Sequence, residues 1–240
     1  MNRMKGLGTL RRAQKLSDEE QAVIRRIEAA RAELERSDAE IETIDYGAGP
    51  DGSRTADEMA RGVRVMRGVS ELCRSSSKPP DAARLLFRLV RERRPGRSLE
   101  LGTCLGISAA YQAAALELNG QGSLITLEGA PAVAARARSL LEELGLGRRV
   151  EVLVGRFVDL LPGLVERHRF DFAFIDGHHD EAATVDYFRR IRPAMSSGGL
   201  LVFDDIEWSD GMRRAWRTIR SDSHVAKSST RQGLGLAALR

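Results

Sequence analysis

The chain has 240 residues, of which 42% are hydrophobic and 30% charged, the composition of an ordinary folded protein that is long enough for a sizeable core. The formal net charge of +4 would allow a nucleic-acid partner, but the arginines are scattered and only 5% of the residues are aromatic, so nucleic-acid binding is disfavoured. Apolar runs stay well below the roughly 20 residues that cross a bilayer, and residues 1–12 lack the apolar core of a signal peptide, so we expect a cytoplasmic protein without a membrane partner.

The first 78 residues are expected to form a helical N-terminal extension that caps a main domain at residues 79–240. A helix is predicted at residues 16–36, because Ser17 and Glu20 fit a capping box and apolar residues recur at helical spacing. The apolar stripe of this helix also suggests a homodimer.

The stretch IETIDYGAGP, residues 41–50, is predicted to be a loop between helices. Its D-x-G-x-G pattern imitates a cofactor-binding turn, but Pro50 stands where a helix should begin and no buried strand precedes it. Such a loop could still close over a substrate, with Tyr46 as a wall. A second helix is predicted at residues 55–74, and SSSKPP, residues 75–80, is interpreted as the linker to the main domain.

From residue 81 onward, helical and strand patterns alternate. Strands are predicted at residues 98–101, 123–127, 150–154, 170–175 and 200–203, helices at 81–93, 107–118, 132–144, 157–167, 182–194 and 211–220, and a closing hairpin at 224–228 and 235–239. Such alternation predicts an α/β fold with a mostly parallel sheet that helices cover on both faces. Right-handed crossovers bring the carboxyl ends of parallel strands to one edge, where ligands bind at the point at which the strand order reverses.

The sequence SLELGTCLGIS, residues 98–108, ends the first main-domain strand and begins the next helix. Gly102 and Gly106 allow a sharp turn and a close approach of a ligand to the backbone, at the positive end of the helix dipole. Glu100 can accept hydrogen bonds from an ammonium or from hydroxyl groups. The spacing E-x-G-x-x-x-G-x-S differs from the dinucleotide fingerprint G-x-G-x-x-G, which counts against a nicotinamide-dependent oxidoreductase.

Two further strand ends carry residues that suit a nucleoside. Glu128 ends the second strand, 22 residues after Gly106, where a carboxylate can accept both hydroxyls of a ribose. Its alternative role is that of an acid at a helix N-terminus. Gly155 and Arg156 follow the third strand, where an ordinary turn is one interpretation.

Three aspartates follow the next two strands, in FDFAFIDGHHD and GGLLVFDDIEWS. If these strands are neighbours, about 4.8 Å apart, Asp176, Asp204 and Asp205 converge, and a divalent cation such as Mg²⁺ could relieve their repulsion. Alternatively, the aspartates cap helices and bond to backbone amides. His179 could act as a general base toward a hydroxyl, whereas His178 is interpreted as an exposed bystander.

Together, E-L-G-T-x-x-G-x-S, I-D-G-x-H and the D-D pair resemble class I S-adenosyl-L-methionine (SAM)-dependent O-methyltransferases, nearest to small bacterial enzymes akin to catechol and macrolide-sugar O-methyltransferases. The resemblance covers roughly residues 85–239 and implies a Rossmann-like sheet with an antiparallel last strand. It also implies a set of SAM-binding residues: Glu100, Gly102, Thr103, Gly106, Ile107 and Ser108 near the methionine part, Glu128 and Gly129 at the ribose, Gly155 and Arg156 near the adenine, and Asp176.

For the acceptor side, the resemblance implies that Asp176, Asp204 and Asp205 ligate the metal and that His179, with Asp176, carries the catalysis. Catechol-type enzymes usually have Asp-Asn where this chain has Asp204-Asp205, which shifts the expected substrate away from catechols. We therefore predict a SAM-dependent methyltransferase that acts on a small-molecule hydroxyl with metal assistance. A nicotinamide-dependent oxidoreductase and a basic nucleic-acid-binding protein are the alternatives.

Overall fold

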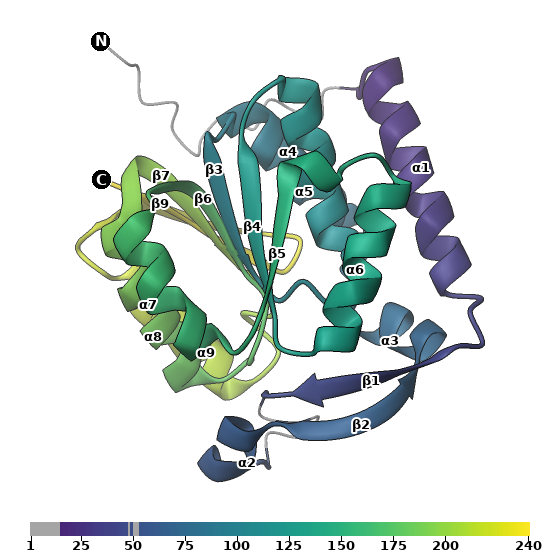
Figure 1. Cartoon of the computed structure of the whole chain (residues 1–240). Helices are drawn as coiled ribbons and strands as arrows, with labels where there is room; N and C mark the ends of the chain where they lie inside the picture. The colour runs from purple at the N-terminus through teal and green to yellow at the C-terminus, as the bar shows by residue number, and fades with distance from the viewer. Residues whose placement is uncertain (1–14, 48, 50–52) are drawn as a thin grey trace.

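The structure is a computed structural model that describes residues 15–47, 49 and 53–240, with a seven-stranded sheet between two layers of helices (Figure 1). The strands follow the order β5-β4-β3-β6-β7-β9-β8. β3 to β7 are parallel, and β9 pairs antiparallel with both β7 and β8. This confirms the predicted Rossmann-like sheet. The strands are β3 Arg97–Leu101, β4 Ser123–Glu128, β5 Val150–Val154, β6 Phe170–Ile175, β7 Met195–Phe203, β8 Val225–Arg231 and β9 Leu234–Leu239.

Helices cover both faces of the sheet. On one face lie α4 Pro80–Arg93, α5 Ile107–Asn119 and α6 Pro131–Glu143, and on the other lie α7 Phe157–Arg167, α8 Glu181–Ile191 and α9 Asp210–Arg220 (Figure 1). Short 3₁₀ turns at Gly147–Arg149 and Arg192–Ala194 precede β5 and β7. Successive strand residues point to opposite faces, so in β6 Phe172 and Phe174 enter one core while Ala173 and Ile175 enter the other.

The strand order reverses at β3, since the chain passes from β3 through β4 to β5 on one side and then returns to β6 on the other. β6 and β7 are parallel neighbours, with Ile175 beside Phe203, as the convergence of the aspartates requires. The carboxyl ends of β3, β4 and β6 therefore surround the crevice in which open α/β sheets bind ligands.

The N-terminal extension is not purely helical, because β1 Glu40–Asp45 pairs antiparallel with β2 Val63–Gly68. The predicted loop at residues 41–50 thus begins as a strand, and its Pro50 lies outside the described residues. The predicted helix at residues 55–74 is three elements, α2 Ala56–Arg61, β2 and α3 Val69–Ser76. Gly62 ends α2 at a φ of +73°, which favours glycine, and the alternating VRVMRG then forms a strand. We call β1, α2 and β2 the N-terminal hairpin.

Helix α1 Asp18–Leu34 begins at the predicted capping box, in which the Ser17 and Glu20 side chains each accept from the other's backbone N–H. It packs against α5 and α3. Its apolar stripe is buried in the same core as α4 and α5, so the face that suggested a homodimer is used within the chain. The core therefore also crosses the predicted domain boundary at residue 78.

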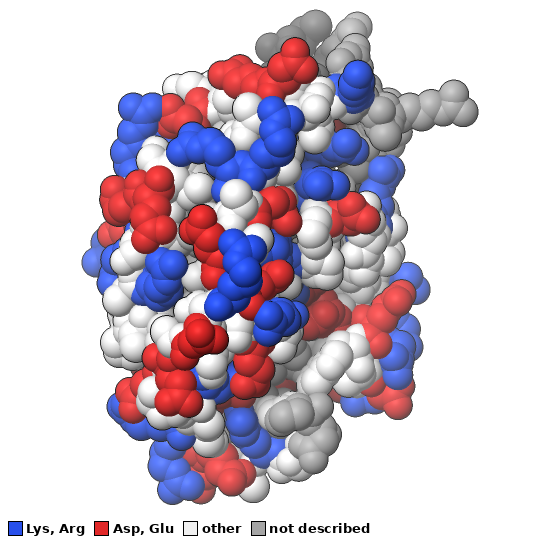
Figure 2. All heavy atoms as spheres, turned by 90° about the vertical axis from the view of Figure 1, so that its right-hand side faces the viewer, with Lys and Arg blue, Asp and Glu red and all other residues white. Residues whose placement is uncertain are grey.

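Positive and negative side chains are mixed on the face that carries α1 and α6 (Figure 2). Several arginines have acidic partners close by, as Arg148 and Arg149 have in Glu117 and Arg136 has in Glu143. This face thus lacks the one-signed stripe that is typical of nucleic-acid binding. Within residues 15–47, 49 and 53–240, no helix is both long enough and apolar enough to cross a membrane.

Candidate functional site

The turn between β3 and α5 requires glycine at two positions. Gly102 has a φ of +100°, and a Cβ there would lie 1.9 Å from the Asp176 carbonyl oxygen. Gly106 is the N-cap of α5 at a φ of +89°, and a Cβ there would lie 3.2 Å from the Ala137 side chain of α6. The turn is further held by the N–H groups of Gly102 and Thr103, which donate to the Leu127 carbonyl. Gly102 therefore allows the ends of β3 and β6 to lie against each other, and Gly106 allows the start of α5 to lie against α6.

Glu100 lies beneath this turn, with its carboxyl bonded to groups of the protein, and its contact with a ligand stays a prediction. It is fully buried, its Oε1 accepts from the Gln112 side-chain amide at 2.7 Å, and its Oε2 accepts from the Thr126 hydroxyl at 2.6 Å. The Thr103 hydroxyl joins this network 2.6 Å from Thr126 Oγ1. Burial raises the pKa of Glu100 to about 8, although the hydrogen bonds from Thr126 and Gln112 oppose the rise. Glu100 and Thr103 brace the turn from below.

Ile107 and Ser108 begin α5, and both side chains are buried. Their backbone N–H groups belong to the first turn of a helix and carry its partial positive charge, but neither residue lines the cavity between the sheet edge and the N-terminal hairpin.

Glu128, at the end of β4, links two turns and faces a cavity. Its Oε2 accepts from the Cys104 N–H and its Oε1 from the Ala130 N–H, each at 2.9 Å. Burial raises the pKa of Glu128, while these backbone donors oppose the rise. An ionised carboxylate has about four acceptor positions, so two such bonds leave capacity for a pair of hydroxyls.

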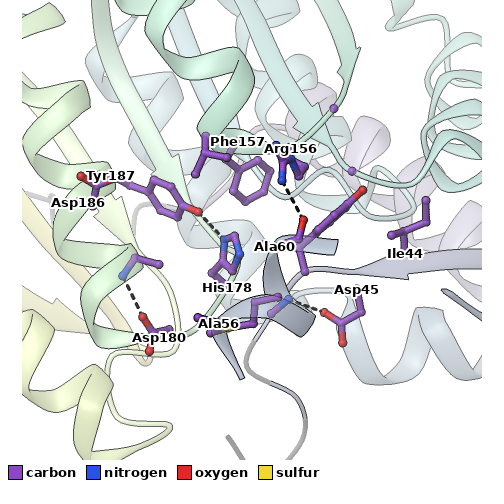
Figure 3. Close-up of a pocket in the computed structure, with 18 of the residues that line it drawn as sticks. Ile44, Asp45, Ala56, Ala60, Arg156, Phe157, His178, Asp180, Asp186 and Tyr187 are labelled. Carbon is purple, nitrogen blue, oxygen red and sulfur yellow. Dashed lines mark hydrogen bonds between the residues drawn. The ribbon is translucent and has the colours of Figure 1, made fainter. Parts of the chain in front are cut away.

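The cavity has a volume of about 350 Å³ and lies between this edge of the sheet and the N-terminal hairpin (Figure 3). Small-molecule sites have volumes of about 300–1,000 Å³. Four predicted site residues share one wall: Glu128, Gly129, Gly155 and Arg156. The remaining lining comes from the start of α7, the segment after β6, α8, the N-terminal hairpin and the residues directly after β1: Phe157, Val158, Gly177, His178, Asp180, Ala183, Asp186, Tyr187, Ile44, Asp45, Tyr46, Gly47, Ala56, Met59 and Ala60.

His178 is part of the cavity wall and not an exposed bystander, which corrects the sequence interpretation. Its Nδ1 is hydrogen-bonded to the Tyr187 hydroxyl. The Phe157 ring packs edge-on against both, 5.9 Å from the His178 ring and 5.7 Å from the Tyr187 ring, and Figure 3 shows the three side chains gathered together. Burial lowers the pKa of His178, although nearby Asp180 opposes the drop. The imidazole is therefore favoured in its neutral form and serves as a wall.

The N-terminal hairpin closes the opposite side of the cavity. The Tyr46 ring covers Gly129, where an added Cβ would lie 2.6 Å from a ring carbon. The Arg156 guanidinium donates to the Ala60 carbonyl at 2.8 Å, a bond that Figure 3 shows crossing from the sheet edge to α2. Asp45 pairs with Arg54 at 2.6 Å. Residues 44–47 therefore lie where the sequence suggested a cover for a ligand.

Asp176 and Asp204 converge at the ends of β6 and β7, but the cation between them is Lys78. Its Nζ lies 3.2 Å from Asp176 Oδ1 and contacts Asp204 Oδ2, and all three side chains are at most 11% exposed. Asp205 is more exposed and lies beside His179. In the described part of the chain, no three His, Cys, Asp or Glu residues are arranged to hold a metal ion. The predicted Mg²⁺ ligands Asp176, Asp204 and Asp205 therefore do not fit a divalent cation, because an ammonium lies between the first two.

His179 adjoins this acidic cluster. Its Nε2 is 3.9 Å from Asp176 Oδ1, its Nδ1 is 3.4 Å from Asp205 Oδ2, and its ring centre is 5.9 Å from that of Trp208. Positive φ angles occur at His178, His179 and Asp205. Such angles cost non-glycine residues on the order of 1–3 kcal/mol each and cluster at functional sites, so they mark the ends of β6 and β7 as a candidate site.

Sequence reasoning missed Lys78 and Tyr187. Lys78 lies in the segment interpreted as a linker, and Tyr187 lies on α8, where an aromatic residue is ordinary core material. Neither has a local pattern that marks it. His178 had such a signal, since it directly follows Asp176-Gly177 at a strand end.

The methyltransferase-domain family matches residues 99–206, which run from β3 to just beyond β7. A catechol O-methyltransferase of Niastella koreensis is 36% identical over 132 residues, which are 54% of this chain and 58% of that protein. A catechol O-methyltransferase of Mycobacterium tuberculosis is 36% identical over 110 residues, 46% of this chain and 48% of that protein. The chain thus spans about half the length of these curated relatives.

Solved structures give the same likeness. An O-methyltransferase from Bacillus cereus in complex with SAH has a TM-score of 0.60 at 26% identity, over 69% of this chain and 84% of that one. The O-methyltransferase TomG from Streptomyces achromogenes, involved in tomaymycin synthesis and in complex with SAM, has a TM-score of 0.60 at 28% identity, over 68% of this chain and 82% of that one. These likenesses support the class I O-methyltransferase resemblance on a Rossmann-like methyltransferase fold.

Proposed function

We propose that this chain, whose fold is that of the class I methyltransferases, transfers the methyl group of SAM to a hydroxyl of a small molecule. The observation that carries the proposal is the shared cavity wall of Glu128, Gly129, Gly155 and Arg156, tied to the β3–α5 turn by the bond from the Cys104 N–H to Glu128. The likeness to O-methyltransferases in complex with SAM and SAH supports the same cofactor.

In this proposal, Glu128 accepts hydrogen bonds from the two ribose hydroxyls, with Gly129 beside the sugar. The adenine lies along Gly155 and Arg156, and the cavity gives it Phe157 as an apolar neighbour. The methionine part extends along the turn from Gly102 to Ser108, where the first backbone N–H groups of α5 can meet its carboxylate.

We propose His179, which lies between Asp176 and Asp205, as the general base. A neutral imidazole takes the proton of the acceptor hydroxyl as the oxygen attacks the sulfonium methyl. The oxygen–carbon bond forms while the carbon–sulfur bond breaks, so the products are the methyl ether, the neutral thioether SAH and a protonated histidine. Holding the two reactants in line can contribute about 7–11 kcal/mol to lowering the barrier.

Residues 1–78 are proposed as a cap on the methyltransferase domain, since the N-terminal hairpin lines the cavity. A homodimer stays a prediction. The apolar stripe of α1, which suggested it, is buried within the chain and is not available to a second copy. Light scattering on the full chain would decide the oligomeric state.

Calorimetry with SAM and SAH tests the cofactor assignment. We expect micromolar-range binding of both, and a loss of about 10- to 100-fold in affinity for Glu128→Gln, because a hydrogen bond to a charged group contributes about 1.5–3 kcal/mol. Glu151→Gln, at an exposed glutamate of β5, is the matched control and should bind as the unmodified chain does. Absence of SAM and SAH binding would remove the proposal.

Two alternatives are measured on the same preparation. An oxidoreductase would bind a nicotinamide dinucleotide in the calorimeter instead of SAM. A nucleic-acid-binding protein would give a gel shift that weakens steeply with salt.

A further inference from the structure

We propose that Lys78 permanently supplies the positive charge of the acidic cluster at the ends of β6 and β7, so that this cluster takes no divalent cation. The inference goes beyond the proposed function. Only its consequence for the reaction, that methyl transfer needs no metal ion, rests on that function.

The two carboxylates are fixed by the sheet and need a cation. The Asp176 N–H donates to the Leu101 carbonyl at 2.9 Å, and the Asp204 N–H donates to the Ile175 carbonyl at 3.0 Å. The backbone of both aspartates is therefore bonded to the neighbouring strand. Both side chains are largely withdrawn from water. Two carboxylates this close cannot both stay ionised without compensation, and one ammonium in contact with both provides it.

Lys78 is anchored on its own side as well. Its carbonyl accepts from the Arg31 guanidinium at 2.7 Å, and Arg31 is itself buried in α1. Pro79 and Pro80 follow directly, with Pro80 beginning α4. Because prolines restrict the backbone, the lysine is delivered from a stiff junction between α3 and α4, and not from a freely moving linker.

The ammonium and a metal ion would compete for the same oxygens. Asp176 Oδ1 is 3.2 Å from Lys78 Nζ, and Asp204 Oδ2 contacts the same nitrogen. A divalent ion needs its carboxylate ligands at about 2.0–2.6 Å and several further oxygens around it. It could bind these two acids only if the lysine side chain withdrew.

Manganese titration monitored by electron paramagnetic resonance tests the proposal on the full chain. The unmodified chain should bind no Mn²⁺ at about 1 mM, a concentration that fills even weak oxygen-ligand sites, and EDTA or Mg²⁺ should leave its melting temperature unchanged. Lys78→Met should gain a Mn²⁺ site that a second change, Asp204→Asn, abolishes. Lys227→Met, at an exposed lysine of β8, is the matched control and should behave as the unmodified chain.

Two results would overturn the proposal: Mn²⁺ binding by the unmodified chain that Asp204→Asn removes, or a folded Lys78→Met variant that gains no site. If circular dichroism shows that Lys78→Met does not fold, Lys78→Gln replaces it, since a neutral amide can still donate to a carboxylate. The titration of the unmodified chain decides the claim in either case. SAM binding is measured by calorimetry and Mn²⁺ binding by titration. A failure of the proposed cofactor is therefore distinguishable from a failure of the proposed role of Lys78.

Discussion

Gly102→Ala tests whether the β3–α5 turn depends on the close approach of two backbones. The new Cβ would lie 1.9 Å from the Asp176 carbonyl oxygen and 3.0 Å from its carbonyl carbon, so β3 and the end of β6 must separate. That movement stretches the bond from the Asp176 N–H to the Leu101 carbonyl. Gly120→Ala is the matched control, because Gly120 also has a positive φ, +68°, but has nothing within 4 Å of an added Cβ.

The two variants should differ in magnitude. Alanine at a left-handed position costs about 1–2 kcal/mol, which is the whole expected loss for Gly120→Ala. Gly102→Ala adds about 1–3 kcal/mol for overpacking and about 1 kcal/mol for the weakened hydrogen bond, so its loss should be about 4 kcal/mol. Urea unfolding followed by circular dichroism measures both free energies of unfolding. If the two variants lose equal stability, the close approach does not matter and the reasoning is refuted.

Two further predictions concern Glu100 and Tyr46. The pKa of Glu100 is about 8 in the folded chain and about 4.3 in an unfolded one, so between these pH values the folded state binds a proton that the unfolded state has released. The free energy of unfolding should therefore fall as the pH rises from about 5 to 8, by at most about 5 kcal/mol. Urea unfolding of Glu100→Gln should show a smaller fall over the same pH range. An equal fall in both proteins would contradict a protonated Glu100 in the folded state. Tyr46→Ala, which uncovers Gly129, should raise the SAM dissociation constant about tenfold, or about 1.4 kcal/mol. The control Met66→Ala, at an exposed residue of β2, should leave that constant unchanged, and equal calorimetric results for the two variants would rule out a role for the ring.

The sheet could be predicted because each of its elements carries a local pattern. The strand at β3 is followed by Gly102 and Gly106, and the strands at β6 and β7 are followed by aspartates, so the positions of these strands along the chain could be predicted, whereas their order in the sheet could not. β6 and β7 are neighbours in the structure, which meets the condition on which the convergence of the aspartates depended. What spacing could not predict is which acid lies beneath the turn, because Glu100 and Glu128 both lie at or next to the ends of strands and only packing buries Glu100 completely.

The N-terminal hairpin was mispredicted for a local reason. Met59, Val63 and Met66 are spaced as on one face of a helix, and that pattern outweighed the alternation in β2. The decisive residue is Gly62, where an added Cβ would lie 2.6 Å from the Ile44 side chain and 2.7 Å from the Tyr46 ring. Glycine is needed at position 62 because β1 packs against it, and β1 lies too far away in the sequence for a local pattern to show this.

Lys78 could not be predicted at all, since its partners lie about a hundred residues further along the chain, at Asp176 and Asp204. The acids by themselves are equally compatible with a metal ion, with helix caps and with a lysine. Only the three-dimensional path of α3 into α4 distinguishes these possibilities. Acid spacing at strand ends is thus evidence for a site that binds a cation, and the kind of cation has to be learned from the fold.

The position of the N-terminal hairpin links cofactor binding to acceptor choice. The hairpin contacts the sheet edge through Tyr46 over Gly129 and through the bond from Arg156 to the Ala60 carbonyl, so the residues proposed for the ribose and the adenine also hold the cover. A cofactor that binds beneath the hairpin must either displace the Tyr46 ring and break the Arg156–Ala60 bond, or fit beside them. Because the cover and the rest of the wall come from different parts of the sequence, changes in residues 40–68 should alter which acceptor is methylated more than they alter the motifs for SAM. Acceptor specificity is therefore best sought by exchanging the hairpin, and not by varying the glycine-rich turn.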